Sequence, residues 1–118
     1  MSQASIALDI KRHDDVTVVT IEGSRVPADM GDSFEEQIVT VIGDLPTPRV
    51  LIDFGQVTFV SSSILGKLIK LDGRVTDAQG QLTLCGLSVR IAEVFKITGL
   101  EKLFSIQATR EDALQSFQ

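Results

Sequence analysis

Three consecutive serines, Ser61, Ser62 and Ser63, are the residues of this chain best placed to carry chemistry. They follow a short loop after an apolar run and lead into a segment with helical spacing. The first amide groups of a helix lack partners within the helix and carry partial positive charge, so a serine there often acts as a cap. A phosphate on another serine would be stabilised by the same amides and would add about two negative charges. The cluster therefore indicates either a helix cap alone or a cap combined with a regulatory phosphorylation site.

The remaining reactive side chains do not form a catalytic pattern. His13 lies beside Asp14 and Asp15 in a predicted turn, where we expect it to be solvated and far from any nucleophile. Cys85 is the single cysteine and falls in an apolar strand, where a thiol behaves as a small buried hydrophobe. There is no glycine-rich phosphate loop, dinucleotide fingerprint or calcium-binding carboxylate motif. We therefore expect no enzyme activity, no catalytic residue, no cofactor and no metal site.

Hydrophobic periodicity predicts the elements that position the serines. The second helix has an apolar stripe of Leu65, Leu68, Ile69 and Val75, and the third has one of Ile91, Val94 and Phe95. The expected order begins with a hairpin over 6–18, with Asp14 and Asp15 in its turn, a helix over 30–42 that Gly43 ends, and a strand over 50–52. Next come a helix from Ser63 to the turn at Gln79 and Gly80, a strand over 82–85, and a helix that Ser88 caps and that ends near Gly99. The last elements are a short strand over 104–106 and a C-terminal helix, which begins at a capping box formed by Thr109 and Asp112 and carries Leu114 and Phe117.

Strands that alternate with helices predict an α/β fold. We expect a mixed, mostly parallel sheet of four to five strands, with the N-terminal hairpin at one edge and about four helices. The chain has 118 residues, of which 43% are hydrophobic, and this is enough for one core without disulfides. Residues 1–118 are therefore interpreted as a single domain, with its core over about 5–117.

The charge of the chain is acidic and uneven. The net charge is −5, and residues 1–59 hold 4 basic and 10 acidic side chains, against 7 basic and 6 acidic in residues 60–118. An acidic surface repels phosphate backbones and anionic lipids, and no run of 18 apolar residues occurs. We expect a soluble cytoplasmic protein with neither nucleic acid nor membrane as a partner.

The run from Val50 to Gly66, VLIDFGQVTFVSSSILG, resembles the signature of the STAS domain in bacterial anti-sigma factor antagonists. The run from Leu82 to Phe104 is similar to the strand, helix and strand that follow in the same family. The resemblance implies a small mixed sheet with helices packed mainly on one side. It also implies a module that sequesters an anti-sigma factor of the serine-kinase type and so frees a sigma factor, with a PP2C-type phosphatase as a further partner.

The same resemblance carries residue roles onto this chain. It places the phosphorylated serine at Ser62, with Ser61 and Ser63 as alternates. Ser61 stands where the family has aspartate, Ile64 where it has glycine, and Val26 where an acidic residue is usual. The expected partner-binding residues are the loop and the outer face of the second helix, namely Ser61, Ser62, Ser63, Ile64, Lys67, Lys70 and Arg74.

Other interpretations of these residues stay open on the sequence alone. Lys67, Lys70 and Arg74 are also consistent with an ordinary solvated helix face. A STAS domain that has lost the switch would act as an assembly domain in a signalling complex. A third alternative is a small anion or nucleotide bound at the helix N-terminus.

Overall fold

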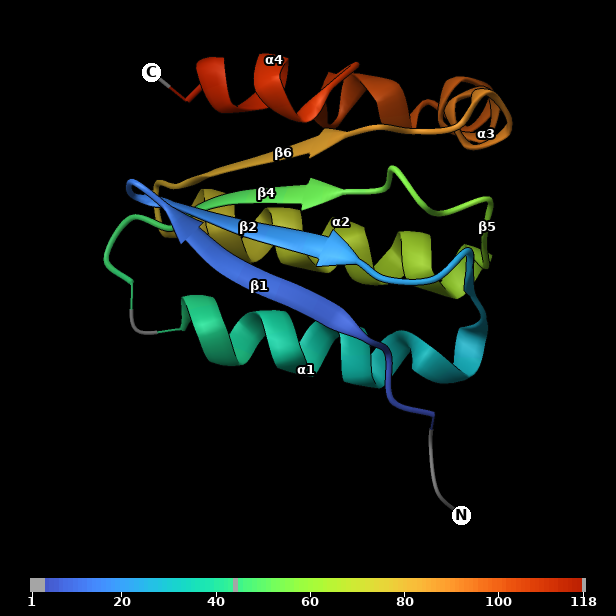
Figure 1. Ribbon diagram of the computed structural model, residues 1–118, viewed down its shortest axis with the longest axis horizontal. Helices are drawn as coiled ribbons and strands as arrows, with labels where there is room; N and C mark the ends of the chain where they lie inside the picture. Colours follow the sequence, from blue (N-terminus) through green and yellow to red (C-terminus); the bar gives the residue numbers. More distant parts are fainter. Residues whose placement is uncertain (1–3, 44, 118) are drawn as a thin grey trace.

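A five-stranded sheet in the order β1-β2-β4-β6-β7 forms the centre of the fold (Figure 1). The structure is a computed structural model that describes residues 4–43 and 45–117. Its elements are β1 (Leu8–His13), β2 (Val16–Ile21), β3 (Arg25–Val26), the 3-10 helix η1 (Ala28–Met30), α1 (Gly31–Ile42), β4 (Arg49–Asp53), β5 (Phe59–Val60), α2 (Ser62–Asp77), β6 (Gln81–Cys85), α3 (Val89–Thr98), η2 (Leu100–Lys102), β7 (Ser105–Gln107) and α4 (Arg110–Gln115).

The topology confirms the mixed, mostly parallel sheet. β1 pairs antiparallel with β2 through a turn in which Asp14 adopts a φ of 55°, so the N-terminal hairpin forms one edge. β2, β4, β6 and β7 are parallel neighbours. Because parallel strands end at the same edge of a sheet, the loops that follow β4 and β6 meet there.

Strand alternation divides the apolar side chains between two faces. Val50 and Ile52 of β4 belong to the large core under α1, α2 and α3, whereas Leu51 points to the opposite face. Among the described elements, α4 covers that opposite face, through a smaller cluster of Val16, Val18, Leu51, Cys85, Ala113 and Phe117. The expectation of helices mainly on one side of the sheet is therefore confirmed.

The predicted helix ends depend on short-range contacts, and the structure has them. The Ser88 hydroxyl accepts a hydrogen bond from the Ile91 amide at 3.2 Å, and the Thr109 hydroxyl accepts one from the Asp112 amide at 3.1 Å. Gly99 ends α3 with a φ of 80°, a conformation that glycine adopts without a steric cost.

The structure also contains elements that the sequence pattern did not predict. β3 and β5 form a separate two-stranded parallel sheet, because Arg25 pairs with Phe59 and Val26 pairs with Val60. Strands of two residues have no measurable periodicity, so only the folded chain reveals them. Two side chains expected in helical core stripes are instead exposed, Ile69 by 41% and Val94 by 38%.

No helix within the described parts of the chain is long and apolar enough to cross a membrane.

Candidate functional site

The loop between β4 and α2 is anchored by its own apolar side chains. Phe54 is fully buried and Val57 is 2% exposed. The Phe54 amide donates to the Cys85 carbonyl at 2.9 Å, which ties the end of β4 to the end of β6. These contacts bring the chain to the edge of the sheet where α2 begins (Figure 1).

The second sheet then fixes the approach to the serines. The amides of Thr58 and Phe59 both donate to the Ser24 carbonyl, at 2.7 and 3.1 Å. The Ser61 amide donates to the carbonyl of Val26 at 3.1 Å, and the Val26 side chain is fully buried. Thus Val26, which stands where the family usually has an acidic residue, acts here as a core residue that holds the loop.

Ser61 occupies the N-cap position of α2, but its side chain does not make the expected cap. Its backbone is extended, with φ −75° and ψ 160°, and its carbonyl accepts from the Ile64 amide at 3.1 Å. The Ser61 and Ser63 hydroxyls are 3.0 Å apart and bond to each other instead. The prediction that the side chain of one of the three serines caps α2 is therefore wrong, because no side-chain hydroxyl among the described residues accepts a capping hydrogen bond at this helix end.

Ser62 is the first residue of α2 and is exposed. Within the described parts of the chain, its hydroxyl has no hydrogen-bond partner, and the amides of Ser62 and Ser63 donate to no acceptor. An anionic group on Ser62 would therefore sit beside unpaired amides at the positive end of a 16-residue helix.

Ile64 differs from the expectation that it contacts a partner. Its side chain is fully buried, and its Cδ1 lies 3.6 Å from the position that a Cβ atom on Gly31 would occupy. The residue therefore packs in the core between α2 and the start of α1. Because no atom of this side chain reaches the surface, Ile64 is removed from the docking residues.

Lys67 also has a different environment from the expected free helix face. Its Nζ atom lies 3.0 Å from an Asp32 carboxylate oxygen and 3.1 Å from one of Glu35, both on α1. Lys70 lies 3.4 Å from the second Glu35 oxygen, while Arg74 is exposed. The hydrogen bond from Lys67 lowers the pKa of Glu35, and the hydrogen bonds to Asp32 and Glu35 raise the pKa of Lys67. These charges tie α1 to α2, and only Lys70 and Arg74 remain well exposed.

The surface of α2 that continues from Ser62 is made of small or apolar side chains. Ser62, Gly66, Ile69 and Gly73 are all exposed, and their spacing places them along one line of the helix. We call this line the outer stripe. A Cβ atom on Gly66 or Gly73 would meet no heavy atom within 4 Å, so the fold itself does not require glycine at either position.

Arg25 and Phe59 are site residues that the sequence pattern missed. The Arg25 guanidinium carbon lies 4.4 Å from the centre of the Phe59 ring, and Phe59 is 38% exposed, two residues before Ser61. The stacking places a cation in the same surface as the serines. One signal for Arg25 was present in the sequence, since it is one of only 4 basic residues among residues 1–59. Its contact with Phe59, however, depends on the pairing of β3 with β5.

The other reactive side chains are placed as expected. His13 is exposed at the end of β1, with its Nε2 atom 3.9 Å from an Asp14 oxygen. Cys85 is buried, and burial together with the neighbouring Asp53 carboxylate raises the pKa of its thiol to about 12. A thiol with so high a pKa is not a nucleophile at neutral pH.

Comparison with known proteins was consistent with this geometry. The STAS domain family model matches residues 7–113. BtrV of Bordetella bronchiseptica, which is named as an anti-sigma factor antagonist, is 33% identical over 70 residues, which are 59% of this chain and 60% of BtrV. This chain therefore matches about three fifths of the length of that relative.

Two solved structures extend the comparison to nearly the whole fold. An anti-sigma factor antagonist from Mycobacterium paratuberculosis is 26% identical, with a TM-score of 0.82 over 95% of this chain and 93% of that one. The Bacillus cell fate determinant SpoIIAA in its phosphorylated form shares the fold at 20% identity, with a TM-score of 0.71 over 95% of this chain and 100% of that one. Since the family model matches residues 7–113, which are most of the chain, this chain belongs to the STAS domain family.

Proposed function

We propose that this chain is an anti-sigma factor antagonist whose binding is controlled by phosphorylation of Ser62. The observation that carries the proposal is the state of Ser62, which is exposed at the first position of α2 and whose hydroxyl and neighbouring amides have no partner among the described residues. The names of BtrV and of the M. paratuberculosis structure support the class of partner. The phosphorylated form of SpoIIAA supports a covalent switch on this fold.

Among the three serines, accessibility favours Ser62 as the acceptor. Ser61 is half-buried, and its hydroxyl forms a hydrogen bond with the Ser63 hydroxyl at 3.0 Å. A kinase would therefore reach Ser62 without breaking an existing hydrogen bond. Ser61 and Ser63 remain the alternates.

The docking surface consists of the serine loop, the outer stripe, and the exposed cations beside them. Lys70, Arg74 and Arg25 give this surface a positive rim, whereas Ile64 and Lys67 act within the fold. Without phosphate, small side chains at Ser62 and Gly66 let the backbone of a partner approach α2 closely. With phosphate, about two negative charges would have to be desolvated in the same contact, so the complex dissociates.

In this proposal the protein is a binding module rather than an enzyme, and it works in the cytoplasm together with the serine-kinase anti-sigma factor and a PP2C-type phosphatase. The buried, high-pKa thiol of Cys85 and the exposed position of His13 beside Asp14 support a role without catalysis.

A phosphotransfer experiment tests the proposal. The full chain is incubated with ATP and the purified serine-kinase anti-sigma factor of the same organism, and incorporated phosphate is located by mass spectrometry. We expect stoichiometric modification of the wild type, none in Ser62→Ala, and full modification in the matched Ser63→Ala variant. Equal modification of wild type and Ser62→Ala would remove Ser62 from the mechanism, and a complete absence of modification in all three would favour the assembly role instead.

A further inference from the structure

The exposed apolar side chains of this protein are concentrated at one end of the molecule. In the part of the chain that the structure describes, the exposed large hydrophobic residues are Phe59, Ile69, Val89, Val94, Ile97 and Leu103. Phe59 and Ile69 belong to the docking surface already described. The other four lie on α3 and the turn after η2, and we call them the α3 patch.

The exposure of the α3 patch is large and is not needed for folding. Ile97 is 83% exposed, Val89 79% and Leu103 50%. α3 is already held to the core by Ile91 and Phe95, which are 2% and 1% exposed. A polar residue of similar helix propensity would serve equally well at the exposed positions, so their apolar character points to a contact outside the chain.

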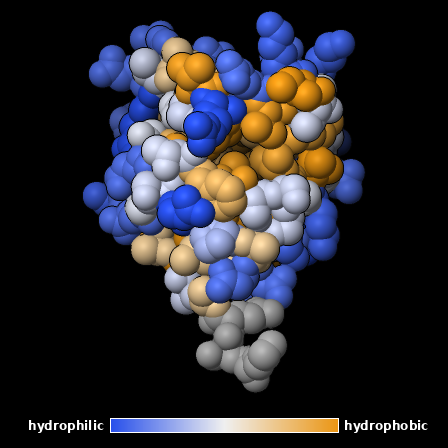
Figure 2. Space-filling view, turned by 90° about the vertical axis from the view of Figure 1, so that its right-hand side faces the viewer, coloured by the Kyte–Doolittle hydropathy of each residue, from blue (hydrophilic) through white to orange (hydrophobic). Residues whose placement is uncertain are grey.

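The α3 patch lies at the same edge of the sheet as the face that carries Ser62. β4 and β6 are parallel neighbours, so α2, which follows β4 and β5, and α3, which follows β6, both start at the same edge of the sheet (Figure 1). Figure 2 looks onto this edge and shows hydrophobic side chains gathered in its upper part, at the height where α3 lies in Figure 1. One partner surface can therefore touch both regions.

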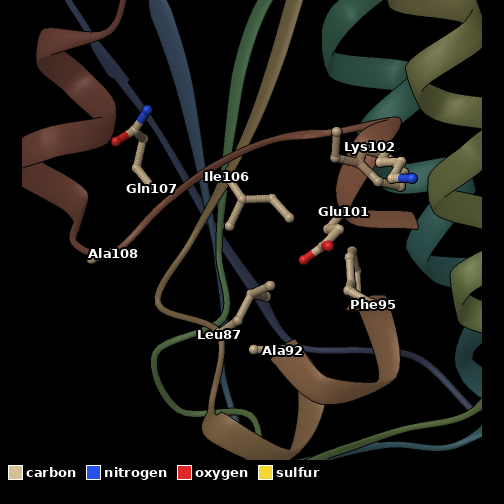
Figure 3. A pocket seen from close by; sticks show the side chains of 9 residues that line it. Leu87, Ala92, Phe95, Glu101, Lys102, Ile106, Gln107 and Ala108 are labelled. Atoms are coloured by element: carbon tan, nitrogen blue, oxygen red, sulfur yellow. The ribbon is translucent and has the colours of Figure 1, made fainter. Parts of the chain in front are cut away.

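A groove on the other flank of α3 adds a place for an anchoring side chain. It has a volume of about 550 Å³ and lies between α3 and β7. Leu87, Ala92, Phe95 and Ile106 point into it, with the Glu101 carboxylate among them, and Lys102 stands at its rim (Figure 3). An apolar partner side chain that enters this groove would contact Leu87, Phe95 and Ile106, and apolar contacts of this kind are common in binding hot spots.

From these observations we propose that the same anti-sigma factor that docks on the serine loop also covers the α3 patch, so that α3 forms the apolar half of the interface. This inference rests on the proposed function. A second copy of this chain is a poorer occupant for two reasons. Each copy carries a net charge of −5, so copies repel each other, and a copy seated on this face would hide Ser62 from the kinase. The two halves then have different roles, since phosphate acts at α2 while α3 supplies affinity that does not depend on charge.

The test is the double variant Val89→Ser plus Ile97→Ser, with Lys96→Ser on the same helix as the matched control. Valine, isoleucine and serine have similar helix propensities, and both apolar side chains are highly exposed, so thermal stability should be unchanged. Affinity for the purified anti-sigma factor is measured by calorimetry at low and at high salt. We expect the double variant to bind about tenfold more weakly or worse at both salt concentrations, whereas Lys96→Ser changes affinity little.

Three results would overturn the proposal. Unchanged affinity of the double variant, while Ser62→Asp abolishes binding, would reject the role of α3 and leave the proposed function intact. Concentration-dependent dimerisation of the wild type that the double variant loses would assign the patch to a second copy. Failure of the wild type itself to bind the anti-sigma factor would reject both this inference and the proposed function.

Discussion

Gly66 offers a prediction in which stability and binding should move in opposite directions. Gly66 is exposed in the interior of α2, and a Cβ atom there would meet no heavy atom within 4 Å. In an exposed helix, alanine is more favourable than glycine by about 1 kcal/mol, so Gly66→Ala should stabilise the protein by that amount. For a domain of this length, the melting temperature should rise by about 4 °C.

The same substitution should weaken docking. If a partner packs against the outer stripe beside Ser62, an added methyl group overpacks the contact and costs about 1 kcal/mol or more, which is about a fivefold loss of affinity. Gly73→Ala is the matched control, because it is about 10 Å further along the same line of the helix and should stabilise equally with a smaller effect on binding. Melting is followed by circular dichroism and affinity by calorimetry.

Two outcomes would refute this reasoning. A lower melting temperature for Gly66→Ala would mean that a neighbour occupies the space beside the glycine. A higher melting temperature with unchanged affinity would mean that the glycine does not serve a close contact, and the docking surface would then have to lie elsewhere.

Further predictions concern the packing around the site. The Thr17 hydroxyl is buried without a partner in the described chain, so Thr17→Val should raise the free energy of unfolding in urea by about 1 kcal/mol. Thr83→Val should not raise it, because the Gln81 side chain donates to the Thr83 hydroxyl at 3.3 Å, and equal effects of the two substitutions would contradict this. The pKa of Glu35 is lowered in the folded state, so the stability that its ion pair adds is present above the ordinary pKa of 4.5 and is lost as the pH falls through the lower folded pKa. The difference in melting temperature between wild type and Lys67→Met should therefore vanish in acid. A difference that stays constant with pH would argue against the ion pair. The Arg110 Nε atom donates to an Asp53 carboxylate oxygen at 2.9 Å and so ties the start of α4 to the end of β4. Arg110→Ala should therefore loosen α4 by about 1 kcal/mol and speed labelling of the Cys85 thiol, which packs under α4, by about fivefold, whereas Arg90→Ala should not. Equal labelling of both variants would show that Arg110 does not hold α4.

Much of the fold was predictable because its determinants are local. The apolar run Val50 to Ile52 belongs to a strand covered on both faces, and the caps at Ser88 and Thr109 form with amides three residues away. Gly99 likewise ends α3 through its own backbone conformation. Such features depend on short stretches of sequence, so a pattern identifies them before any tertiary contact is known.

The candidate site was less predictable because its details depend on distant segments. The helix pattern predicted that Lys67 lies on an exposed face of α2, yet it contacts Asp32 and Glu35 on α1, which are 35 and 32 residues earlier in the sequence. Ile64 was expected at the surface because it follows the serines, but the start of α1 covers it. Arg25 joined the site only through the pairing of β3 with β5. The position of the serines at the start of α2 was predicted correctly, whereas their neighbours required the folded chain.

A phosphate at Ser62 should control partner binding, and one titration tests this most directly. Affinity for the anti-sigma factor is measured with the unmodified protein and with the same protein phosphorylated to completion at Ser62, in the same buffer. We predict that phosphorylation weakens binding by at least about tenfold, because about two added charges must be desolvated in the contact, and that added salt changes the size of this loss. Equal affinity of the two forms would contradict the switch and leave a STAS domain that binds without regulation at Ser62.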